Sequence, residues 1–586
     1  MSSYTCTNFG GYRDKLLRPL DKQTKRSRMV LLFFGLLFSV LIARALYMLF
    51  FSSSFLQNQG EARFRRHLTI HATRGMITDR DGGALAISAR VESIWVSPSS
   101  MNKVPNQQLQ KLAELLQIPL SDIRAKLSNK KKDFVYLKRH IPPELAKKII
   151  DLGIAGIATQ TEYRRFYPTG ELFAHVLGFT GIDDAGQEGL ELAYNNQLAG
   201  HDGSRVVIKD RLGHIVDDLA AIEQPKNGRK LVLSIDQKLQ YLAFRELKAG
   251  VEANKAKSGS VVVLDAQTGE ILAMANYPSY NPNNRQIIHP NQLRNSAVTD
   301  LTEPGSTIKP ILVSKAIDSG KVTPNTVLNT SSYKIGGAIV RDVQAYPSLN
   351  VAGVIQKSSN VGVSKLALMF SPREMWNFYH TVGFGRPLYS NFPGESAGSL
   401  RNPANWQPIE QATMSFGYGV AASLLQMARA YTIFTTDGQL LPVSFSKLSI
   451  RPEGERVISS ATAYKMRQML VAVTQPGGTA MRVQVLGYNV AGKSGTVRKL
   501  EKGVYQPNKH AGLFVGFAPV LTKPRFIVAV MIDEPRAGFY YGGSVAGPVF
   551  SRIMSGCLRT FGVASDMTAN QLLTTSNDFA NKKVGM

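Results

Sequence analysis

Cysteine is scarce in this sequence, which has only Cys6 and Cys557 among its 586 residues. A disulfide scaffold needs several cysteines on the same, oxidising side of a membrane. Cys6 precedes a long apolar run and Cys557 follows it, so the two thiols are expected on opposite sides of a membrane. We therefore exclude an intramolecular disulfide and expect the fold to depend on an apolar core, which a chain of this length can bury.

Acidic residues are also in short supply, because 42 Asp and Glu stand against 69 Lys and Arg, for a formal net charge of +27. Such a charge is typical of nucleic-acid-binding proteins, but it also suits proteins that meet anionic lipid or anionic cell wall. Seven of the basic residues lie within residues 1–28, which contain only two acidic ones. The location of the chain relative to a membrane therefore decides between these partners.

Residues 29–51 form an apolar run with a single charge, Arg44, and a helix of this length spans a bilayer core. The run is too long for a removable signal peptide and lacks its small-residue cleavage site. It predicts an uncleaved single-pass anchor, with the basic tail 1–28 in the cytoplasm and the rest of the chain outside. That topology argues against nucleic acid as a partner of the outer part.

The length suggests several folding units beyond the anchor. After a polar linker (52–60), we expect a mixed, non-catalytic unit at residues 61–228, the pedestal. It should contain two strands around the turn Asp79-Arg80-Asp81-Gly82, helices at 106–127 and 142–152, and an irregular connector at 162–195. The polar tail 565–586 is expected to be disordered.

Residues 229–564 predict a second, α+β domain. A strand at 230–236 should lead into a helix, followed by two strands in SVVVLDAQTGEILAMAN and, much later, two more in HAGLFVGFAPV and PRFIVAVMID. A sheet formed by the first and last strands, with a helical block inserted between them, would be mainly antiparallel.

The stretch Thr302-Glu-Pro-Gly-Ser-Thr-Ile-Lys-Pro310 organises this second domain. Proline fits a helix without loss only in the first turn, so Pro310 places a helix start close to Ser306. Ser306 and Lys309 then share one face, where the amine of Lys309 can act as base for the hydroxyl of Ser306. Backbone N–H groups at the helix start favour negative charge on an acyl oxygen that Ser306 attacks.

The Ser-x-x-Lys string alone is weak evidence, since the sequence has five of them, the others starting at Ser100, Ser128, Ser331 and Ser444. Two further motifs follow the one at Ser306 in order. Ser358-Ser-Asn360 lies 52 residues after Ser306, in GVIQKSSNVGVSKLAL. Lys493-Ser494-Gly495-Thr496 lies in a stretch typical of a strand whose glycine allows close approach of a substrate.

The three motifs in this order match the set of penicillin-binding proteins and serine β-lactamases. Together with RGMITDRDGGALA and YPTGELFAHVLGFTGIDDAGQEGLE, they make the chain resemble the class B penicillin-binding proteins over nearly its full length. Its layout is similar to the septal peptidoglycan transpeptidases of that class, and the elongation-specific transpeptidases are the nearest alternative. The resemblance implies an antiparallel five-stranded sheet flanked by helices, with an inserted helical subdomain, behind an elongated pedestal.

The resemblance also implies roles for the motif residues. Ser306 would attack the bond between two D-alanines of a stem pentapeptide, with Lys309 as its base. Ser358 and Asn360 would relay the proton and hold the peptide, and Lys493 would tune their electrostatics. Ser494 and Thr496 would bind the substrate carboxylate on the strand that Gly495 keeps open, and the Ser306 and Thr496 amides would form an oxyanion hole.

The partners implied are peptidoglycan stem pentapeptides, β-lactam antibiotics, the inner (cytoplasmic) membrane, an FtsW-type glycosyltransferase and other divisome proteins, with the catalytic domain in the periplasm. The chemistry calls for no metal and no organic cofactor. A β-lactamase would share the motifs but needs a deacylating base and has no use for an anchor or pedestal. A non-enzymatic β-lactam sensor or divisome scaffold is the other alternative, and the intact Ser306 and Lys309 pair argues against it.

Overall fold

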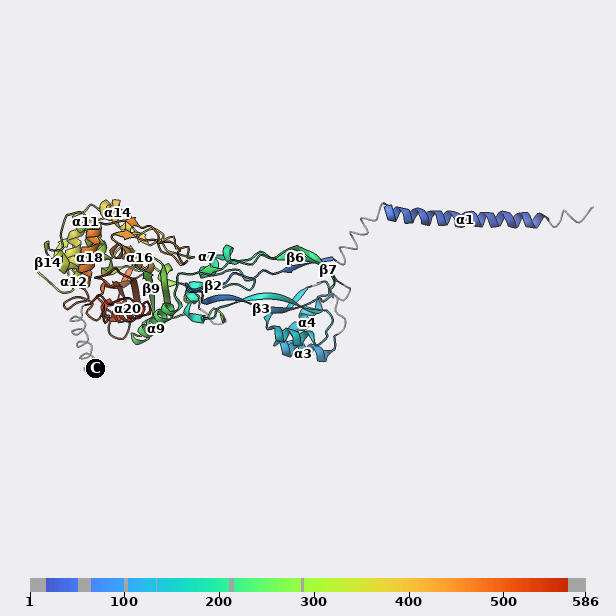
Figure 1. The fold of residues 1–586 in the computed structure, drawn as a ribbon, viewed down its shortest axis with the longest axis horizontal. Coiled ribbons are helices and arrows are strands. Elements are labelled where there is room, and N and C mark those ends of the chain that lie inside the picture. The colour runs from blue at the N-terminus through green and yellow to red at the C-terminus, as the bar shows by residue number, and fades with distance from the viewer. Residues whose placement is uncertain are drawn as a thin grey trace, which may run out of the picture.

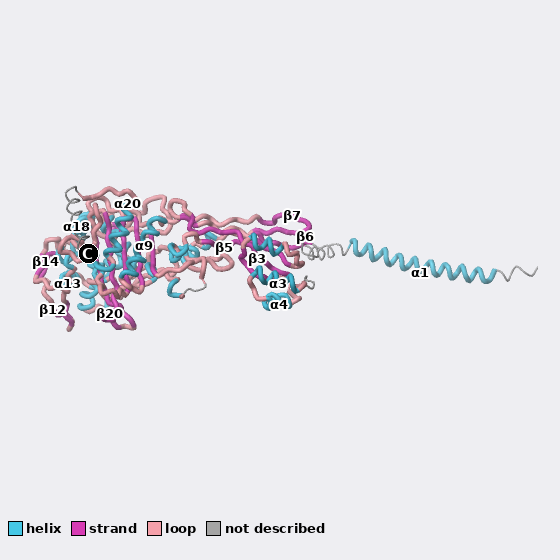
Figure 2. Tube along the Cα trace, turned by 90° about the horizontal axis from the view of Figure 1, so that it is seen from below, coloured by secondary structure: helices cyan, strands magenta, loops and turns pink. Residues whose placement is uncertain are grey.

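The computed structural model describes residues 17–50, 65–99, 104–132, 134–209, 215–285 and 289–567. An elongated, strand-rich unit runs from the helices α3 (Asn106–Leu116) and α4 (Leu120–Ser128) to a larger, helix-rich domain (Figures 1 and 2). We keep the name pedestal for residues 65–235 and call residues 237–567 the C-terminal domain. The predicted linker 52–60, the thiol of Cys6 and the string at Ser100 lie outside the described residues.

The predicted anchor is part of a single long helix, α1 (Leu17–Phe50). Within it, residues Thr24–Phe50 are long and apolar enough to cross a membrane. The helix begins inside the basic segment 1–28, so the described part of that predicted tail is helical. Residues 1–16 lie outside the described part of the chain.

Two sheets build the pedestal. One has the strand order β1-β6-β7, and the other has the order β4-β3-β2-β8, with β5 also pairing with β3. The strands are β1 (Arg65–Ile70), β2 (Ile77–Thr78), β3 (Ala84–Val96), β4 (Val135–Ile141), β5 (Ile157–Phe166), β6 (Gly203–Lys209), β7 (Ile215–Glu223) and β8 (Leu231–Val232). The shorter elements are α5 (Pro143–Ile150), η1 (Gly170–Leu172), α6 (Ala174–Leu177), α7 (Gly189–Ala193) and α8 (Asn195–Leu198).

The turn predicted at residues 79–82 is confirmed, because it joins β2 to β3 and the backbone N–H of Asp79 donates to the carbonyl of Gly83 at 2.9 Å. Three other expectations need correction. The helix expected at 106–127 is two helices, because Gln117 adopts a left-handed φ of 51° and Pro119 precedes α4. The expected connector at 162–195 begins as strand, because β5 extends to Phe166 and pairs with β3.

The third correction concerns the boundary at 228/229. The strand expected at 230–236 to open the second domain is the short β8, and it pairs with β2 in parallel. It therefore belongs to the pedestal sheet, and the C-terminal domain begins with α9 (Gln237–Ala253), whose N-cap is the Asp236 carboxylate. A short apolar strand has no feature of its own that tells which of two adjacent sheets it joins.

A buried cluster of charges ties the pedestal together near the C-terminal domain. The Glu191 carboxylate is fully buried and accepts from Nε of Arg74 at 2.7 Å and from Nε of Arg165 at 2.6 Å. Both guanidinium groups also donate to backbone carbonyls, at Glu191 and Gly75. Removal of the shared carboxylate would leave two buried positive charges without their anion.

The C-terminal domain is built on a five-stranded antiparallel sheet of order β10-β9-β21-β20-β19, as the resemblance implied. The strands are β9 (Ser258–Asp265), β10 (Ile271–Tyr277), β19 (Ala491–Glu501), β20 (Val504–Ala518) and β21 (Phe526–Asp533). β9 and β21 are buried along nearly their whole length, so both faces of the sheet are covered. The helices α9 and α20 (Gly547–Thr560) pack on each other and on the sheet, and α16 (Leu424–Ala430) packs on β9 and β21.

Residues 278–490, between β10 and β19, form the inserted block. Its longer helices are α11 (Lys309–Asp318), α12 (Val351–Lys357), α13 (Asn360–Ala367), α14 (Pro372–Val382), α15 (Pro408–Met414) and α18 (Ser460–Val471). Its shorter helical elements, with one that follows β21, are η2 (Pro290–Gln292), α10 (Ser296–Thr299), η3 (Gly305–Ile308), η4 (Pro403–Asn405), α17 (Thr432–Thr435) and α19 (Gly542–Val545). Two-residue and three-residue strands complete it: β11 (Val327–Asn329), β12 (Tyr333–Ile335), β13 (Ala338–Val340), β14 (Ser348–Asn350), β15 (Ser399–Leu400), β16 (Val420–Ala421), β17 (Gln439–Leu440) and β18 (Glu455–Arg456).

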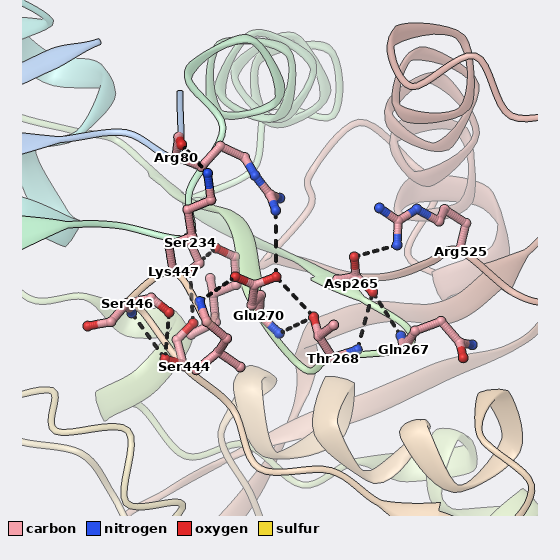
Figure 3. Close-up of polar contacts among 12 residues, drawn as sticks. Arg80, Ser234, Asp265, Gln267, Thr268, Glu270, Ser444, Ser446, Lys447 and Arg525 are labelled. Atoms are coloured by element: carbon pink, nitrogen blue, oxygen red, sulfur yellow. Dashed lines mark hydrogen bonds and ion pairs between the residues drawn. The ribbon is translucent and has the colours of Figure 1, made fainter. Parts of the chain in front are cut away.

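Polar contacts join the pedestal to the C-terminal domain at the β2–β3 turn (Figure 3). The Arg80 carbonyl accepts from Nζ of Lys447 at 2.7 Å, and the Arg80 guanidinium lies 3.5 Å from the Glu270 carboxylate. Glu270 also accepts from the backbone N–H of Leu448 at 2.9 Å. These contacts brace the turn against the loop that joins β9 to β10.

The tail predicted at 565–586 begins too early. Asp566 is buried, and its carboxylate accepts from the backbone N–H groups of Asn489 and Val520, each at 2.7 Å. Residues 565–567 are therefore part of the domain, and residues 568–586 lie outside the described chain.

Candidate active site

Ser306 and Lys309 lie where the predicted helix start was expected. Ser306 is in the single turn η3, and Lys309 opens α11, with Pro310 in its first turn. Ser306 is half-buried, whereas Lys309 is completely buried. A short 3₁₀ turn ahead of the α-helix thus carries the serine, and the lysine points into the domain.

The amine of Lys309 contacts the second motif directly. Its Nζ lies 2.6 Å from the Ser358 carbonyl oxygen, 3.2 Å from Ser358 Oγ and 2.7 Å from Asn360 Oδ1. Burial lowers the pKa of Lys309 well below its usual value, and the charge of Lys493 lowers that pKa further, while Asp342 acts in the opposite direction. A lowered pKa increases the fraction of free amine, which is the form able to accept a proton.

The second motif is held at a sharp break between two helices. Ser358 ends α12 in the left-handed region, at φ 59°, and Ser359 caps α13 by accepting from the Gly362 N–H at 2.8 Å. The left-handed residue turns both the carbonyl and the hydroxyl of Ser358 toward Lys309. A residue other than glycine is strained in this left-handed conformation, and strained residues of this kind are common at active sites.

Asp342 supports this break, a role that was not predicted from the sequence. Its carboxylate accepts from Ser359 Oγ and the Asn360 N–H, each at 2.5 Å, and from the Val361 N–H at 2.9 Å. An acidic group at a helix N-terminus is electrostatically favourable. No local pattern around Asp342 points to this role, because its partners are distant in the sequence.

The third motif lies on β19, which is the edge strand of the sheet. Lys493 is completely buried, its Nζ donates to the Ser494 carbonyl at 3.0 Å, and burial lowers its pKa from 10.5 to about 7. The Ser494 hydroxyl lies 3.3 Å from the hydroxyl of Thr479, and the Thr496 hydroxyl accepts from the Gly542 N–H at 2.9 Å. Thr479 is exposed and was also missed by the sequence analysis.

Two glycines let the serine turn and the edge strand approach each other. A Cβ on Gly495 would lie 2.9 Å from both the Pro304 carbonyl oxygen and Cγ2 of Thr307. A Cβ on Gly305, which has φ 53°, would lie 2.5 Å from Cγ1 of Val497 and 3.6 Å from the Thr496 nitrogen. Glycine is therefore needed at position 495 to make room for η3, in addition to the substrate access predicted from the sequence.

The structure therefore brings the three motifs together around Lys309 and the edge of β19. Within the described residues, no three His, Cys, Asp or Glu side chains gather in a way that could hold a metal ion. A cavity of about 700 Å³ lies in the pedestal around Arg74, Asp184 and Asp202, and none of the motif residues lines it.

An antiparallel sheet with a Lys-Ser-Gly-Thr edge strand, set against a serine and a buried lysine at a helix start, defines the class of active-serine proteins that recognise penicillin. Residues 259–555 match the model of the penicillin-binding protein transpeptidase domain, and residues 69–233 match that of the penicillin-binding protein dimerisation domain. The chain belongs to the penicillin-binding proteins, with the two-domain architecture of class B.

Several relatives are similar over nearly the whole chain. The probable peptidoglycan D,D-transpeptidase PenA of Neisseria gonorrhoeae is 49% identical over 577 residues, which cover 96% of this chain and 99% of the relative. The peptidoglycan D,D-transpeptidase FtsI of Escherichia coli K12 is 40% identical over 90% of both chains. The probable peptidoglycan D,D-transpeptidase PbpC of Pseudomonas aeruginosa is 40% identical over 93% of this chain and 97% of the relative.

Proposed function

We propose that the chain is a membrane-anchored, serine-type peptidoglycan D,D-transpeptidase that cross-links stem peptides at the division septum and is acylated by β-lactams. The relatives named PenA and FtsI support the reaction class. The observation that carries the proposal is the fully buried amine of Lys309, at the start of the helix that follows the Ser306 turn and 2.7 Å from Asn360 Oδ1. A lysine in this setting is a base, and a serine beside it is a nucleophile.

In the first step, Ser306 Oγ attacks the carbonyl carbon between the two terminal D-alanines, and its proton passes to the free amine of Lys309. The C–N bond then breaks, and the terminal D-alanine leaves with a proton relayed through Ser358, whose Oγ lies 3.2 Å from Nζ of Lys309. Lys493 keeps the pKa of Lys309 low by its charge. An acyl-enzyme on Ser306 remains.

The edge of β19 receives the substrate. The backbone N–H groups of Ser306 and Thr496 form the oxyanion hole, in which each donor is typically worth about 3–4 kcal/mol. The hydroxyls of Ser494 and Thr496 bind the carboxylate of the terminal D-alanine or of a β-lactam, and Asn360 holds the peptide. Because Thr496 Oγ1 already accepts from Gly542, its own hydrogen remains free to donate.

In the second step, the free amine of a neighbouring stem peptide attacks the acyl-enzyme, forms the cross-link and regenerates Ser306. The names of the relatives do not favour the elongation-specific, sensor or scaffold alternatives. Purified full-length protein with a pentapeptide donor and an amine acceptor should release D-alanine and form the new amide, and Ser306→Ala should do neither. A hydrolysed donor without amide product would instead indicate a hydrolase.

The anchor orients the enzyme. Residues 1–28 lie in the cytoplasm, α1 crosses the inner membrane once, and the pedestal positions the catalytic domain in the periplasm and docks an FtsW-type glycosyltransferase and other divisome proteins. A phosphatase reporter fused after residue 60 should be active. Activity of a cytoplasm-only reporter at the same position would contradict this orientation.

A further inference from the structure

Glu303 lies three residues before Ser306, and its carboxylate joins two segments that are distant in the sequence. Its Oε1 accepts from the backbone N–H of Gly419 at 2.7 Å and from the hydroxyl of Tyr505 at 2.9 Å. Gly419 follows α15, and Tyr505 lies on β20 next to the tip of the β19–β20 hairpin. One carboxylate oxygen therefore connects the serine turn to a loop on one side and to the hairpin on the other.

The loop around Gly419 packs tightly on the serine turn. A Cβ on Gly417, which has φ 92°, would lie 2.3 Å from both the nitrogen and the carbonyl oxygen of Gly305. Thr302 and Ala422 exchange two backbone hydrogen bonds, at 3.0 and 2.9 Å. This side of η3 is thus fixed by backbone contacts in addition to Glu303.

The hairpin side depends on Tyr505. From Glu303 the chain passes to Gly305, which contacts β19 at Thr496 and Val497. The strand then runs to Leu500, whose register partner on β20 is Tyr505, and the Tyr505 hydroxyl returns to Glu303. This closed ring of bonds and contacts includes both the serine turn η3, which carries Ser306, and the segment of β19 that carries Thr496.

Glu303 is not arranged for maximal stability. Its second carboxylate oxygen, Oε2, is buried without a hydrogen-bond partner among the described residues. Burial also raises the pKa of Glu303, against the two hydrogen bonds that lower it. A buried unsatisfied oxygen costs about as much as one hydrogen bond contributes, so it offsets part of what the two hydrogen bonds of Oε1 add to folding.

We propose that Glu303 is a positioning residue for acylation: through Tyr505 and Gly419 it fixes the spacing between the Ser306 amide and the edge strand β19. The inference rests on the proposed function, in which these amides bind the oxyanion. Small displacements of such donors cost rate because they act only on the charge that develops in the transition state.

The test measures the rate constant of acylation and the dissociation constant of the non-covalent complex, separately, for a fluorescent penicillin and the full-length protein. Glu303→Ala and Tyr505→Phe should each lower the rate constant by roughly tenfold and leave the dissociation constant nearly unchanged. The double variant should lose no more than Glu303→Ala alone, because the Tyr505 hydroxyl acts through the Glu303 carboxylate. Glu303→Gln keeps an acceptor oxygen and should recover most of the rate.

Glu410→Gln is the matched control. Glu410 also accepts from one backbone N–H, that of Gln407, and from one side chain, that of Arg401, but no hydrogen bond joins it to η3 within the described part of the chain. This control should acylate at the normal rate, and Tyr505→Phe and Glu303→Gln should match the parent in thermal stability, because neither leaves the Gly419 N–H without an acceptor. The proposal is wrong if Tyr505→Phe acylates normally, if the losses of the two variants multiply, or if they fall on the dissociation constant alone. The proposed function fails separately, if Ser306→Ala is still labelled.

Discussion

Replacement of Lys493 by methionine should make the C-terminal domain more stable at pH 6 while slowing acylation. Burial lowers the pKa of Lys493 from 10.5 to about 7. The unfolded chain keeps the proton up to about pH 10.5, whereas the folded domain releases it above about pH 7. Between these two pH values the unfolded state binds more protons than the folded state, so the free energy of unfolding rises with pH across this range. Below about pH 7 the charged lysine lowers the free energy of unfolding by its full amount.

The magnitude follows from the two pKa values. The difference between 10.5 and about 7 corresponds to about 5 kcal/mol of unfolding free energy. Methionine fills nearly the same volume but loses the hydrogen bond from Nζ to the Ser494 carbonyl, at a cost of about 1 kcal/mol. The net gain at pH 6 is about 3–4 kcal/mol, which raises the melting temperature by roughly 5 °C or more.

The assay is thermal denaturation of full-length parent and Lys493→Met between pH 6 and 10, together with the rate of penicillin labelling. The stability difference should be largest at pH 6 and shrink as the pH rises. Labelling should slow, because loss of the Lys493 charge raises the pKa of Lys309 and leaves less free amine. A variant that is less stable than the parent at pH 6, or a difference independent of pH, would show that the buried charge of Lys493 does not limit stability.

Two further predictions concern the base Lys309 and the buried charge cluster of the pedestal. The acylation rate of the parent should rise with pH through the lowered pKa of Lys309, because only the neutral amine accepts the serine proton. Lys309→Met should be acylated slowly, at a rate nearly independent of pH. Stopped-flow labelling from pH 5 to 10 checks both, and a parent rate that falls across that range would count against Lys309 as base. Glu191→Gln should destabilise the pedestal by about 3–5 kcal/mol, because it leaves Arg74 and Arg165 buried without their anion. Thermal denaturation should show a transition at lower temperature, while penicillin labelling persists at low temperature. An unchanged melting curve would show that the cluster does not stabilise the pedestal.

Much of the C-terminal domain was predictable, because its signals are local. The apolar runs that became β9, β10, β20 and β21 are bounded by turns, and Pro310 alone places the start of α11. The order of the three motifs then predicted their meeting. The strand β8 was assigned to the wrong unit because two residues carry no information about their neighbour in a sheet.

The supporting residues of the site could not be predicted, since their roles depend on contacts between distant segments. Asp342 accepts hydrogen bonds at the N-terminus of α13, the Thr479 hydroxyl contacts that of Ser494, and Glu303 accepts from Tyr505 of the β19–β20 hairpin. Each is an ordinary polar residue in a loop or strand when only the sequence is read. The steric need for glycine at position 495 could not be predicted either, because the turn that it makes room for, η3, lies far earlier in the chain.

Mass spectrometry of a proteolytic digest of full-length protein treated with a β-lactam tests directly whether Ser306 is the nucleophile. We predict one covalent adduct, on the peptide that contains Ser306, and its absence from the Ser306→Ala variant despite an unchanged melting temperature. An adduct on any peptide without Ser306, or normal labelling of Ser306→Ala, would contradict the assignment of the nucleophile.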